Sequence, residues 1–308
     1  MTAHWKKLGL LYCPEDTDRH PKLATHAANP LPVLLEGNVY RVFYSGRDSD
    51  NRSSVGAVDI DIVRHEVVRD HHAPFFLHGP PGSFHADGVS LGCSYSVGDT
   101  RYLLFMGWQN PPGAHWRGDI GRLTLHPDWT LTLDSDAPFM TSEEKDPVSL
   151  SYPWVWRAAD GSYRMWYGST IDWDAGNGEM LHVINQASSN NGHDWHREGL
   201  AVPYELGVAQ AFSKPVVIEN DTGEGLSMWF SCRGGDGGLY RIGRADSADG
   251  VTWQRVSETA GIDVSAEGWD SDMIEYPHVF AHAGQRYMLY NGNGYGKSGF
   301  GLAVWSDD

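Results

Sequence analysis

Short apolar runs separated by turn residues recur along the whole chain. Each copy contains an apolar run, a Gly turn, a strand rich in aromatic residues, a polar loop and another short strand. The aromatic strands read YRVFYSG from Tyr40, RYLLFMGW from Arg101, YRMWYGS from Tyr163, LSMWFS from Leu226 and QRYMLYNG from Gln285. β-Branched and aromatic residues favour strands, and hardly any segment has the helical period of 3.6 residues. The pattern predicts an all-β protein built from five repeats.

Repeats of roughly sixty residues that contain only short strands are typical of β-propellers, in which four-stranded blades surround a central channel. We therefore expect a five-bladed β-propeller with four-stranded antiparallel blades. The predicted blades span residues 25–70, 84–135, 146–200, 209–258 and 270–305, and residues 1–24 supply a strand or clasp that closes the ring. Because a closed ring is one folding unit, residues 1–308 are expected to form a single domain.

Two polar turns support the repeat. The segments from Ser189 to Trp195 and from Ser247 to Trp253 each combine a Ser, an Asp or Asn, a Gly and a closing Trp in the same order. They resemble the Asp-box turn of sialidases and related propellers, in which the Trp packs into the blade. Asp, Asn and Gly are common turn residues, so we interpret these segments as structural turns and not as catalytic sites.

Charge and cysteine content restrict the partners. The chain has 23 Lys and Arg against 40 Asp and Glu, a formal net charge of −17, which opposes binding to nucleic acids or to an anionic membrane surface. Residues 1–12 lack the apolar core of a signal peptide, and no run approaches the roughly 20 apolar residues that span a bilayer, so a cytoplasmic protein is expected. Cys13, Cys93 and Cys232 are far apart and have no metal-ligand spacing, which predicts buried free thiols. No other spacing fits a transition-metal cage, and neither a metal nor a cofactor is expected.

Propeller topology brings the starts of the innermost strands to the same rim as the loops between second and third strands. Two acidic residues, Asp87 and Glu275, stand at the predicted starts of innermost strands. Burial and neighbouring like charges raise the pKa of a carboxyl group, so one carboxyl can act as an acid while another stays ionised. Glycoside hydrolysis needs such a pair. The alternatives are that Asp87 caps a turn before Gly88 and that Glu275 pairs with a neighbouring Arg.

The same rim carries candidate substrate-binding residues. Arg47, Arg52 and Arg233 offer forked donors for hydroxyl or carboxylate groups, and Trp108, Trp173 and Tyr295 offer apolar faces for sugar rings. The further candidates on this rim are His26, Asn29, His85, Arg117, Tyr152, Asp172, Asn291 and Asn293. The arginines can equally belong to a solvated loop network, Trp108 can pack the rim, and the histidines can be satisfied by backbone carbonyls.

At these residues the chain resembles the five-bladed propeller glycoside hydrolases, which include arabinofuranosidases, xylosidases, invertases, levansucrases and mannoside phosphorylases. It looks most like an uncharacterised group of glycosidase-like propellers. The resemblance covers roughly residues 25–305 and rests on His26 to Pro30, Ser45 to Asp48 with Asn51 to Ser53, Ser151 to Trp154, Gly268 to Ser271 with Glu275 to Pro277, and Asn291 to Gly296. It implies the five-bladed fold and a carboxylate pair at the channel.

The catalytic pattern departs from that of the characterised families, which place a carboxylate at the start of the first blade and a Glu at a middle blade. Here the third blade starts with Ser149, Ser151 and Tyr152. Because the fifth, first and second blades are neighbours in a closed ring, Glu275 and Asp87 can still flank one bond, with Asp48 as a third carboxylate. The resulting hypothesis is a glycosidase-like enzyme that hydrolyses a small glycoside, with Glu275 as general acid, Asp87 as base or nucleophile and Asp48 tuning pKa.

Three alternatives stay open from the sequence. They are a glycoside phosphorylase or transglycosylase, a sugar-binding propeller without catalysis, and a biosynthetic enzyme recruited from the same scaffold, since a fold does not determine a function. The last of these would carry out non-glycosidic chemistry, and the partner that we expect overall is a small carbohydrate or glycoconjugate. The sequence makes no prediction of the oligomeric state. Part of the −17 charge is expected in the channel, which favours a neutral or cationic ligand, and a polyanionic ligand would need the arginines to outweigh this acidity.

Overall fold

Twenty β-strands and one 3-10 turn, η1 (Pro21–Leu23), form the regular structure of the described residues. The computed structural model describes residues 4–14, 18–220, 223–235, 237–256 and 260–306. None of the helical segments within these ranges is long and apolar enough to cross a membrane. The all-β prediction is confirmed.

Antiparallel pairing groups the strands in chain order. The first two sets are β2 (Thr25–Glu36), β3 (Val39–Arg47), β4 (Ser53–Asp61) and β5 (Glu66–Phe76), then β6 (Gly88–Val97), β7 (Thr100–Gln109), β8 (Arg117–Leu125) and β9 (Leu131–Leu133). The next two are β10 (Ser149–Arg157), β11 (Tyr163–Asp172), β12 (Leu181–Ser189) and β13 (His196–Leu200), then β14 (Ala211–Glu219), β15 (Leu226–Arg233), β16 (Arg241–Ser247) and β17 (Gln254–Arg255).

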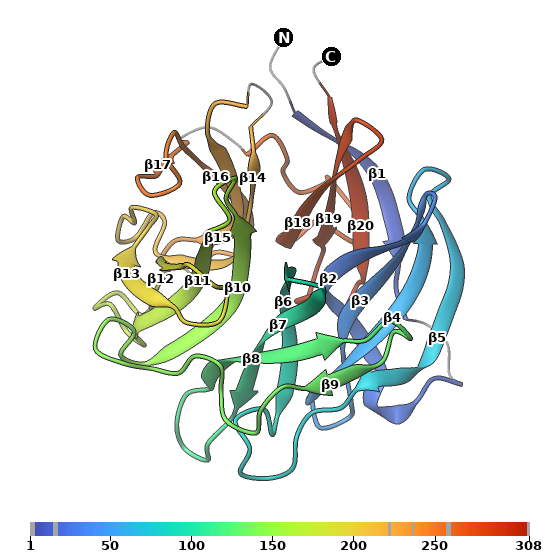
Figure 1. Ribbon diagram of the computed structural model, residues 1–308, viewed down its shortest axis with the longest axis horizontal. Coiled ribbons are helices and arrows are strands. Elements are labelled where there is room, and N and C mark those ends of the chain that lie inside the picture. Colours follow the sequence, from blue (N-terminus) through green and yellow to red (C-terminus); the bar gives the residue numbers. More distant parts are fainter. Residues whose placement is uncertain (1–3, 15–17, 221–222, 236, 257–259, 307–308) are drawn as a thin grey trace.

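The last set joins the two ends of the chain. It contains β18 (Glu275–His282), β19 (Gln285–Asn291), β20 (Phe300–Ser306) and, paired with β20, the first strand β1 (His4–Tyr12). Single parallel contacts, Ser53 with Gly88 and His182 with Ala211, link the first set to the second and the third to the fourth. In Figure 1 the sheets lie around a common centre, with β2, β6, β10, β14 and β18 nearest to it.

Four of these inner strands carry the same irregularity. Asn29, Tyr152, Lys214 and Tyr276 have φ angles of 55°, 37°, 52° and 52°, and each is followed by a proline. The pairing register with the second strand shifts at each of these sites. A positive φ is uncommon for residues with a side chain, and a β-bulge redirects the side chains around it. The fifth inner strand, β6, shifts its register between Leu91 and Cys93 instead.

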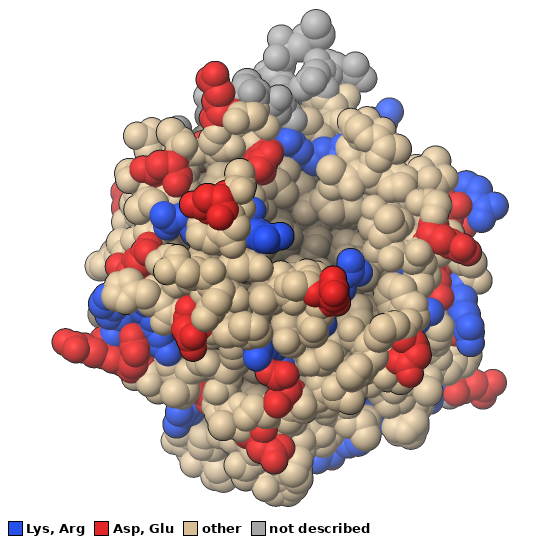
Figure 2. Space-filling model, in the orientation of Figure 1, with Lys and Arg blue, Asp and Glu red and all other residues tan. Residues whose placement is uncertain are grey.

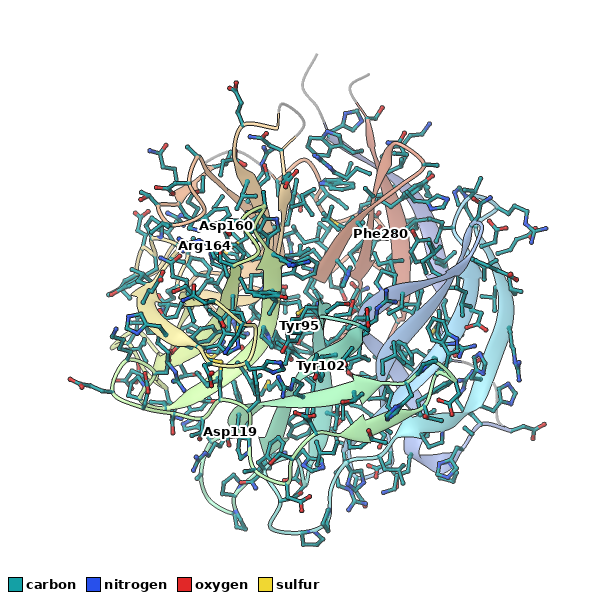
Figure 3. The ribbon with its side chains drawn as sticks, viewed as in Figure 1. Tyr95, Tyr102, Asp119, Asp160, Arg164 and Phe280 are labelled. Atoms are coloured by element: carbon teal, nitrogen blue, oxygen red, sulfur yellow. The ribbon has the colours of Figure 1, made fainter. Side chains whose placement is uncertain are left out.

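Aromatic side chains fill the space between the sheets. Trp166 and Trp229 are fully buried, and Trp229 packs against Trp5 of β1 with ring centroids 5.6 Å apart. Figure 3 shows Tyr95 and Tyr102 on the neighbouring strands β6 and β7, where their ring centroids lie 5.5 Å apart. These large rings bury much apolar area and tie each sheet to its neighbours. Cys93 is buried, as expected, whereas Cys13 and Cys232 are half-buried, so the prediction of buried thiols holds for Cys93 alone.

The two Asp-box turns have the predicted structural role. Asp249 Oδ1 accepts hydrogen bonds from the backbone N–H groups of Val251 and Thr252, both at 2.8 Å. These bonds hold the pKa of Asp249 down at about 2. The closing Trp253 is buried and packs edge-on against Trp166 at 5.5 Å. Asn191 makes the equivalent bonds to His193 and Asp194 at 2.8 and 2.9 Å.

Replacing Trp5 by Ala should destabilise the protein strongly. Trp5 is 3% exposed and contacts both Trp229 and Trp305, so the substitution leaves a cavity between β1 and the neighbouring sheet. The expected loss is about 3 to 5 kcal/mol of unfolding free energy, measured by chemical denaturation. Leu10→Ala on the same strand is the control, because Leu10 is 46% exposed and should cost far less. If Trp5→Ala lowered the unfolding free energy no more than Leu10→Ala does, the packing of Trp5 would not contribute to stability.

Candidate functional site

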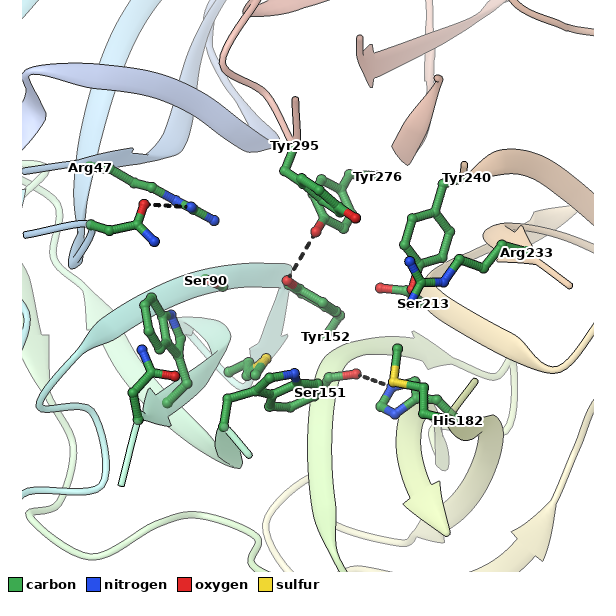
Figure 4. A pocket seen from close by; sticks show the side chains of 16 residues that line it. Arg47, Ser90, Ser151, Tyr152, His182, Ser213, Arg233, Tyr240, Tyr276 and Tyr295 are labelled. Carbon is green, nitrogen blue, oxygen red and sulfur yellow. Dashed lines mark hydrogen bonds between the residues drawn. The ribbon is translucent and has the colours of Figure 1, made fainter. Parts of the chain in front are cut away.

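A cavity of about 320 Å³ lies where the inner strands meet, with residues from every set of strands in its wall. The lining residues are Arg47, Asn51, Ser90, Met106, Trp108, Asn110, Trp116, Ser151, Tyr152, Met180, His182, Ser213, Arg233, Tyr240, Tyr276 and Tyr295. Figure 4 shows their side chains converging on one space. The volume is at the lower end of the range for small-molecule sites, which indicates a small ligand.

Tyrosines form one side of the cavity. The Tyr152 hydroxyl donates a hydrogen bond to the Tyr276 hydroxyl at 3.4 Å, and their ring centroids lie 5.3 Å apart (Figure 4). The ring of Tyr240 packs edge-on against Tyr295 at 6.3 Å. Burial raises the pKa values of Tyr152, Tyr240 and Tyr276, so these phenols stay protonated at neutral pH. They can therefore donate hydrogen bonds to ligand hydroxyl or anionic groups.

Glu275 is fully buried beside this tyrosine cluster. Neither of its carboxyl oxygens has a hydrogen-bond partner of good geometry among the described residues. Burial raises the pKa of Glu275 well above its usual range, and the positive charges of Arg47 and Arg233 and the nearby Tyr276 hydroxyl only partly oppose this effect. A buried carboxyl group without partners is rare in folded proteins, because an unsatisfied polar group is costly. Burial therefore favours the protonated form of the Glu275 carboxyl group.

Two arginines face the cavity from opposite sides (Figure 4). Arg47 Nη1 donates to Asn51 Oδ1 at 2.7 Å, and no carboxylate in the described part of the chain forms an ion pair with Arg47. Arg233 Nη2 pairs with Glu179 at 2.9 Å, and its guanidinium lies 4.8 Å from the centre of the Tyr240 ring. Arg233 Nε is buried without a partner.

The lining differs from the acidic channel that the sequence predicts. Among the described residues, no Asp or Glu lines the cavity, whereas two arginines do. Asp236, on the loop after β15, lies outside the described residues. Figure 2 shows acidic and basic side chains interspersed over the face that it presents. Several carboxylates are instead buried away from the cavity wall in ion pairs, among them Asp48, Asp59 and Asp270.

A hydrogen-bonded chain of three side chains reaches the cavity from β10, β11 and β12. Ser151 Oγ lies 2.8 Å from His182 Nε2, and His182 Nδ1 lies 2.7 Å from Thr170 Oγ1. Burial, followed by the charge of Arg233, lowers the pKa of His182 to about 3, so its imidazole is neutral. Gly168 leaves room for the pair, because a Cβ there would collide with Ser151 Oγ and His182 Nε2.

The two other predicted carboxylates lie outside the cavity wall. Asp87 is half-buried just before β6, and its Oδ2 accepts a hydrogen bond from the N–H of Asn110 at 2.7 Å. Since Asn110 lines the cavity, Asp87 stands behind its rim, while Ser90 is the β6 residue that reaches the wall. The role of Asp87 therefore stays a prediction.

Asp48 is buried in a network of its own. Its Oδ2 pairs with Lys22 at 2.7 Å and with Arg52 at 3.2 Å, and its Oδ1 accepts the N–H groups of Asp50 and Arg52. Burial alone would raise the pKa of Asp48, but the bonds from Lys22 and Arg52 lower it overall. These bonds hold the loop after β3 in place. Arg52 stabilises this loop and does not line the cavity.

Five of the predicted binding residues line the cavity, namely Arg47, Trp108, Tyr152, Arg233 and Tyr295. Trp108 is held by a hydrogen bond from its Nε1 to Ser53 Oγ at 3.2 Å. Trp173 lies one layer further out, since it packs edge-on against the lining residue Trp116 at 4.7 Å and stacks on His115 at 4.7 Å. These aromatic rings form a rim above the His182 side of the cavity.

Three further predicted residues lie outside the cavity wall and contact nearby residues. His26 Nδ1 lies 2.9 Å from Thr25 Oγ1, and Arg117 lies 3.4 Å from Thr141. Asp172 Oδ1 accepts the N–H of Asp174 at 3.1 Å, which makes a local turn.

Three other predicted residues support the backbone near the cavity. Asn291 is fully buried, and its Nδ2 donates to the carbonyl groups of Ala27 and Gly299, both at 2.8 Å. Its Oδ1 accepts the N–H of Asn29 at 2.9 Å. Asn293 Oδ1 accepts the N–H groups of Asp272 and Met273 at 2.8 and 3.2 Å. These amides join the first and last sets of strands and hold the loop before Glu275.

His85 lies in an apolar environment. It packs against Phe84, Phe76 and Phe105, with ring centroids 4.7, 6.0 and 6.1 Å away. Burial lowers its pKa, so the ring is neutral in this aromatic cluster. The structure therefore brings His85 to the core side of the rim and not to the cavity wall.

Sequence reasoning missed most of the wall. The lining residues not predicted as binding residues are Asn51, Ser90, Met106, Asn110, Trp116, Ser151, Met180, His182, Ser213, Tyr240 and Tyr276. One signal was available, because Tyr152-Pro153, Lys214-Pro215 and Tyr276-Pro277 recur at the same place in the repeat. The recurrence marks the bulge and therefore the side chains that surround the centre.

No model of a known protein family matches the chain. Two Mycobacterium tuberculosis proteins, "Uncharacterized protein MT1551" of strain CDC 1551 / Oshkosh and "Uncharacterized protein Rv1502" of strain ATCC 25618 / H37Rv, are each 42% identical to it over 305 residues. These matches cover 97% of this chain and 98% of each relative.

Solved structures that share the fold include glycoside hydrolases. A glycosyl hydrolase from Bacteroides ovatus superimposes with a TM-score of 0.73 at 11% identity, covering 99% of this chain and 94% of its own. An endo-arabinase from Bacteroides thetaiotaomicron has a TM-score of 0.63 at 14% identity, covering 94% of this chain and 97% of its own. A sucrose-6-phosphate hydrolase from Lactobacillus gasseri has a TM-score of 0.62 at 14% identity, covering 92% of this chain and 60% of its own.

The resemblance inferred from the sequence is thus confirmed at the level of the fold. The chain belongs to the family of the uncharacterised M. tuberculosis proteins MT1551 and Rv1502, and it has the fold of the propeller glycoside hydrolases.

Proposed function

We propose that the protein is a glycosidase-like enzyme that hydrolyses a small glycoside, with Glu275 as its general acid. The observation that carries the proposal is the buried carboxyl group of Glu275, which has no partner of good geometry beside a cavity of about 320 Å³. General acids of glycosidases are carboxyl groups whose pKa is raised by their surroundings, so that they hold a proton at neutral pH. The likeness in fold to glycoside hydrolases supports the same reaction class.

In this proposal Glu275 protonates the leaving oxygen of the glycoside as the bond to the anomeric carbon breaks. Tyr276 lines the cavity and its hydroxyl lies near the carboxyl group, so it is the group between Glu275 and the ligand. Ligand binding would shift the Tyr152–Tyr276 pair and open a path for the proton. The remaining tyrosine hydroxyls would hold sugar hydroxyl groups, and Trp108 would contact a ring face.

The second carboxyl group of the proposed pair is Asp87. It stands behind the rim at Asn110, where a small movement of the loop after β7 would bring it to the cavity as base or nucleophile. Asp48 would act only at a distance, by holding the loop that carries Arg47 and Asn51. We also propose that the five sets of four strands are the blades of one five-bladed propeller spanning residues 1–308, with β1 completing the last blade.

A second candidate function is sugar binding without catalysis. It is favoured by one observation, because no carboxylate in the described residues lines the cavity wall. A binding protein needs donors, acceptors and ring faces, and the wall offers all three without any ionised acid.

Glu275→Gln should separate the two functions. If Glu275 is the general acid, the substitution should lower kcat by about 100-fold or more, since general acid catalysis contributes at least that factor. The measurement is turnover of a panel of aryl glycosides and disaccharides, with sugar binding followed by calorimetry. Glu36→Gln is the control, because Glu36 is exposed at the end of β2. Wild-type turnover in Glu275→Gln would rule out the assigned role, and binding without turnover by the wild-type protein would favour the second candidate.

The protonation of Glu275 can be tested without a substrate. Because its pKa is raised in the folded state, the native protein keeps a proton that the unfolded chain loses above a pH of about 4.3. The unfolding free energy of the wild type should therefore fall, relative to Glu275→Gln, by at most about 1.4 kcal/mol per pH unit between this value and the raised pKa. Urea denaturation across this pH range measures the difference, and a difference that stays flat with pH would show that Glu275 is ionised.

A further inference from the structure

We propose that the cavity binds a sugar that carries an anionic group, either a carboxylate or a phosphate, and that Arg47 and Arg233 hold this group. The sugar part of the ligand rests on the proposed function, whereas the anionic group rests on the charges of the cavity itself. The inference reverses the expectation of a neutral or cationic ligand that the net charge of −17 favours.

The charge balance of the cavity is positive. Arg47 and Arg233 line it, and no acidic side chain of the described residues does. Glu179 pairs with Arg233 and offsets one of the two charges, and Glu275 has no partner of good geometry. No carboxylate of the described residues forms an ion pair with Arg47, although its charge acts on the buried Glu275. A half-buried cation without an ion pair attracts a bound anion.

The guanidinium groups retain free donors. An arginine has five N–H donors, and the recorded polar contact of Arg47 is the one from Nη1 to Asn51. Arg233 is held in place by Glu179 and by the Tyr240 ring, and its buried Nε has no acceptor. The planar fork of arginine matches the oxygens of a carboxylate or a phosphate, and such charged hydrogen bonds are about twice as strong as neutral ones.

The positive charge of Arg47 also affects a neighbouring histidine. Burial is the main cause that lowers the pKa of His26 to about 4, and the charges of Arg47 and Lys297 lower it further. This side of the cavity therefore disfavours a further positive charge. The tyrosines add neutral donors around the same space, and the wall has no carboxylate in the described residues to accept the hydroxyl protons of a neutral sugar.

The test is calorimetric titration of the full chain with matched sugars. The sets are glucose, glucuronate and glucose 6-phosphate, and galactose, galacturonate and galactose 6-phosphate, with inorganic phosphate alone as a further probe. At least one anionic member should bind about tenfold or more tightly than its neutral counterpart, since a charged hydrogen bond contributes that much. Preference for the uronates identifies a carboxylate, and preference for the sugar phosphates or for inorganic phosphate identifies a phosphate.

Arg47→Met and Arg233→Met should each reduce the affinity for the preferred anion about tenfold or more and leave the affinity for the neutral sugar nearly unchanged. Arg69→Met is the matched control. Arg69 is exposed on the outer strand β5, so this substitution removes the same charge at a position away from the cavity wall. Thermal denaturation of each variant verifies folding, and Arg47→Lys and Arg233→Lys, which keep the charge, should retain part of the preference.

Three results would overturn the inference: no anionic sugar binds, the neutral sugars bind as tightly, or the folded arginine variants keep the full preference. Binding is measured without turnover, so failure here is distinct from failure of the proposed function. Hydrolysis of neutral glycosides without anion preference would contradict only the ligand class. Arginine-dependent anion binding without any hydrolysis would contradict only the enzymatic role.

Discussion

A bulge on the inner strands determines which side chains reach the centre of the molecule. In a regular strand successive side chains point to opposite faces, so two consecutive residues cannot both face one cavity. At Ser151 and Tyr152 both do, because Tyr152 has a positive φ before Pro153 and the pairing with β11 shifts there. The same bulge lies at Glu275 and Tyr276, where the acid is buried and the phenol lines the cavity.

Burial of these groups in and beside the cavity wall shifts their pKa values. Burial raises the pKa values of Glu275 and the tyrosines and lowers that of His182, since each charged form would lose its hydration. Arginine is the exception, because its guanidinium remains charged in proteins. Arg47 and Arg233 are therefore the charges that the ligand meets. The cavity wall combines neutral donors with two cations, and Glu275 is buried beside it, so the ligand preference that we propose differs from that expected for an acidic protein.

Glu275 could be singled out from the sequence because the repeat aligns it with the starts of the other inner strands. Its neighbour Tyr276 was missed, since strand alternation assigns adjacent residues to opposite faces and the bulge breaks that rule. Asp87 was placed by the same alignment, yet Ser90 is the β6 residue in the wall. On β6 the shift lies after Leu91, so counting from the other repeats misplaces the residue that faces the centre.

The sequence by itself determined the all-β class, the repeat, the free cysteines, the Asp-box turns and five of the cavity residues, because these follow from local patterns of apolar, turn and aromatic residues. Only the tertiary structure decided the rest of the wall. His182, Tyr240 and Tyr295 come from segments far apart in the chain, and their meeting depends on how the sheets lie around one centre. The same holds for charge: composition gives the total of −17, but the tertiary structure decides that two arginines line the cavity.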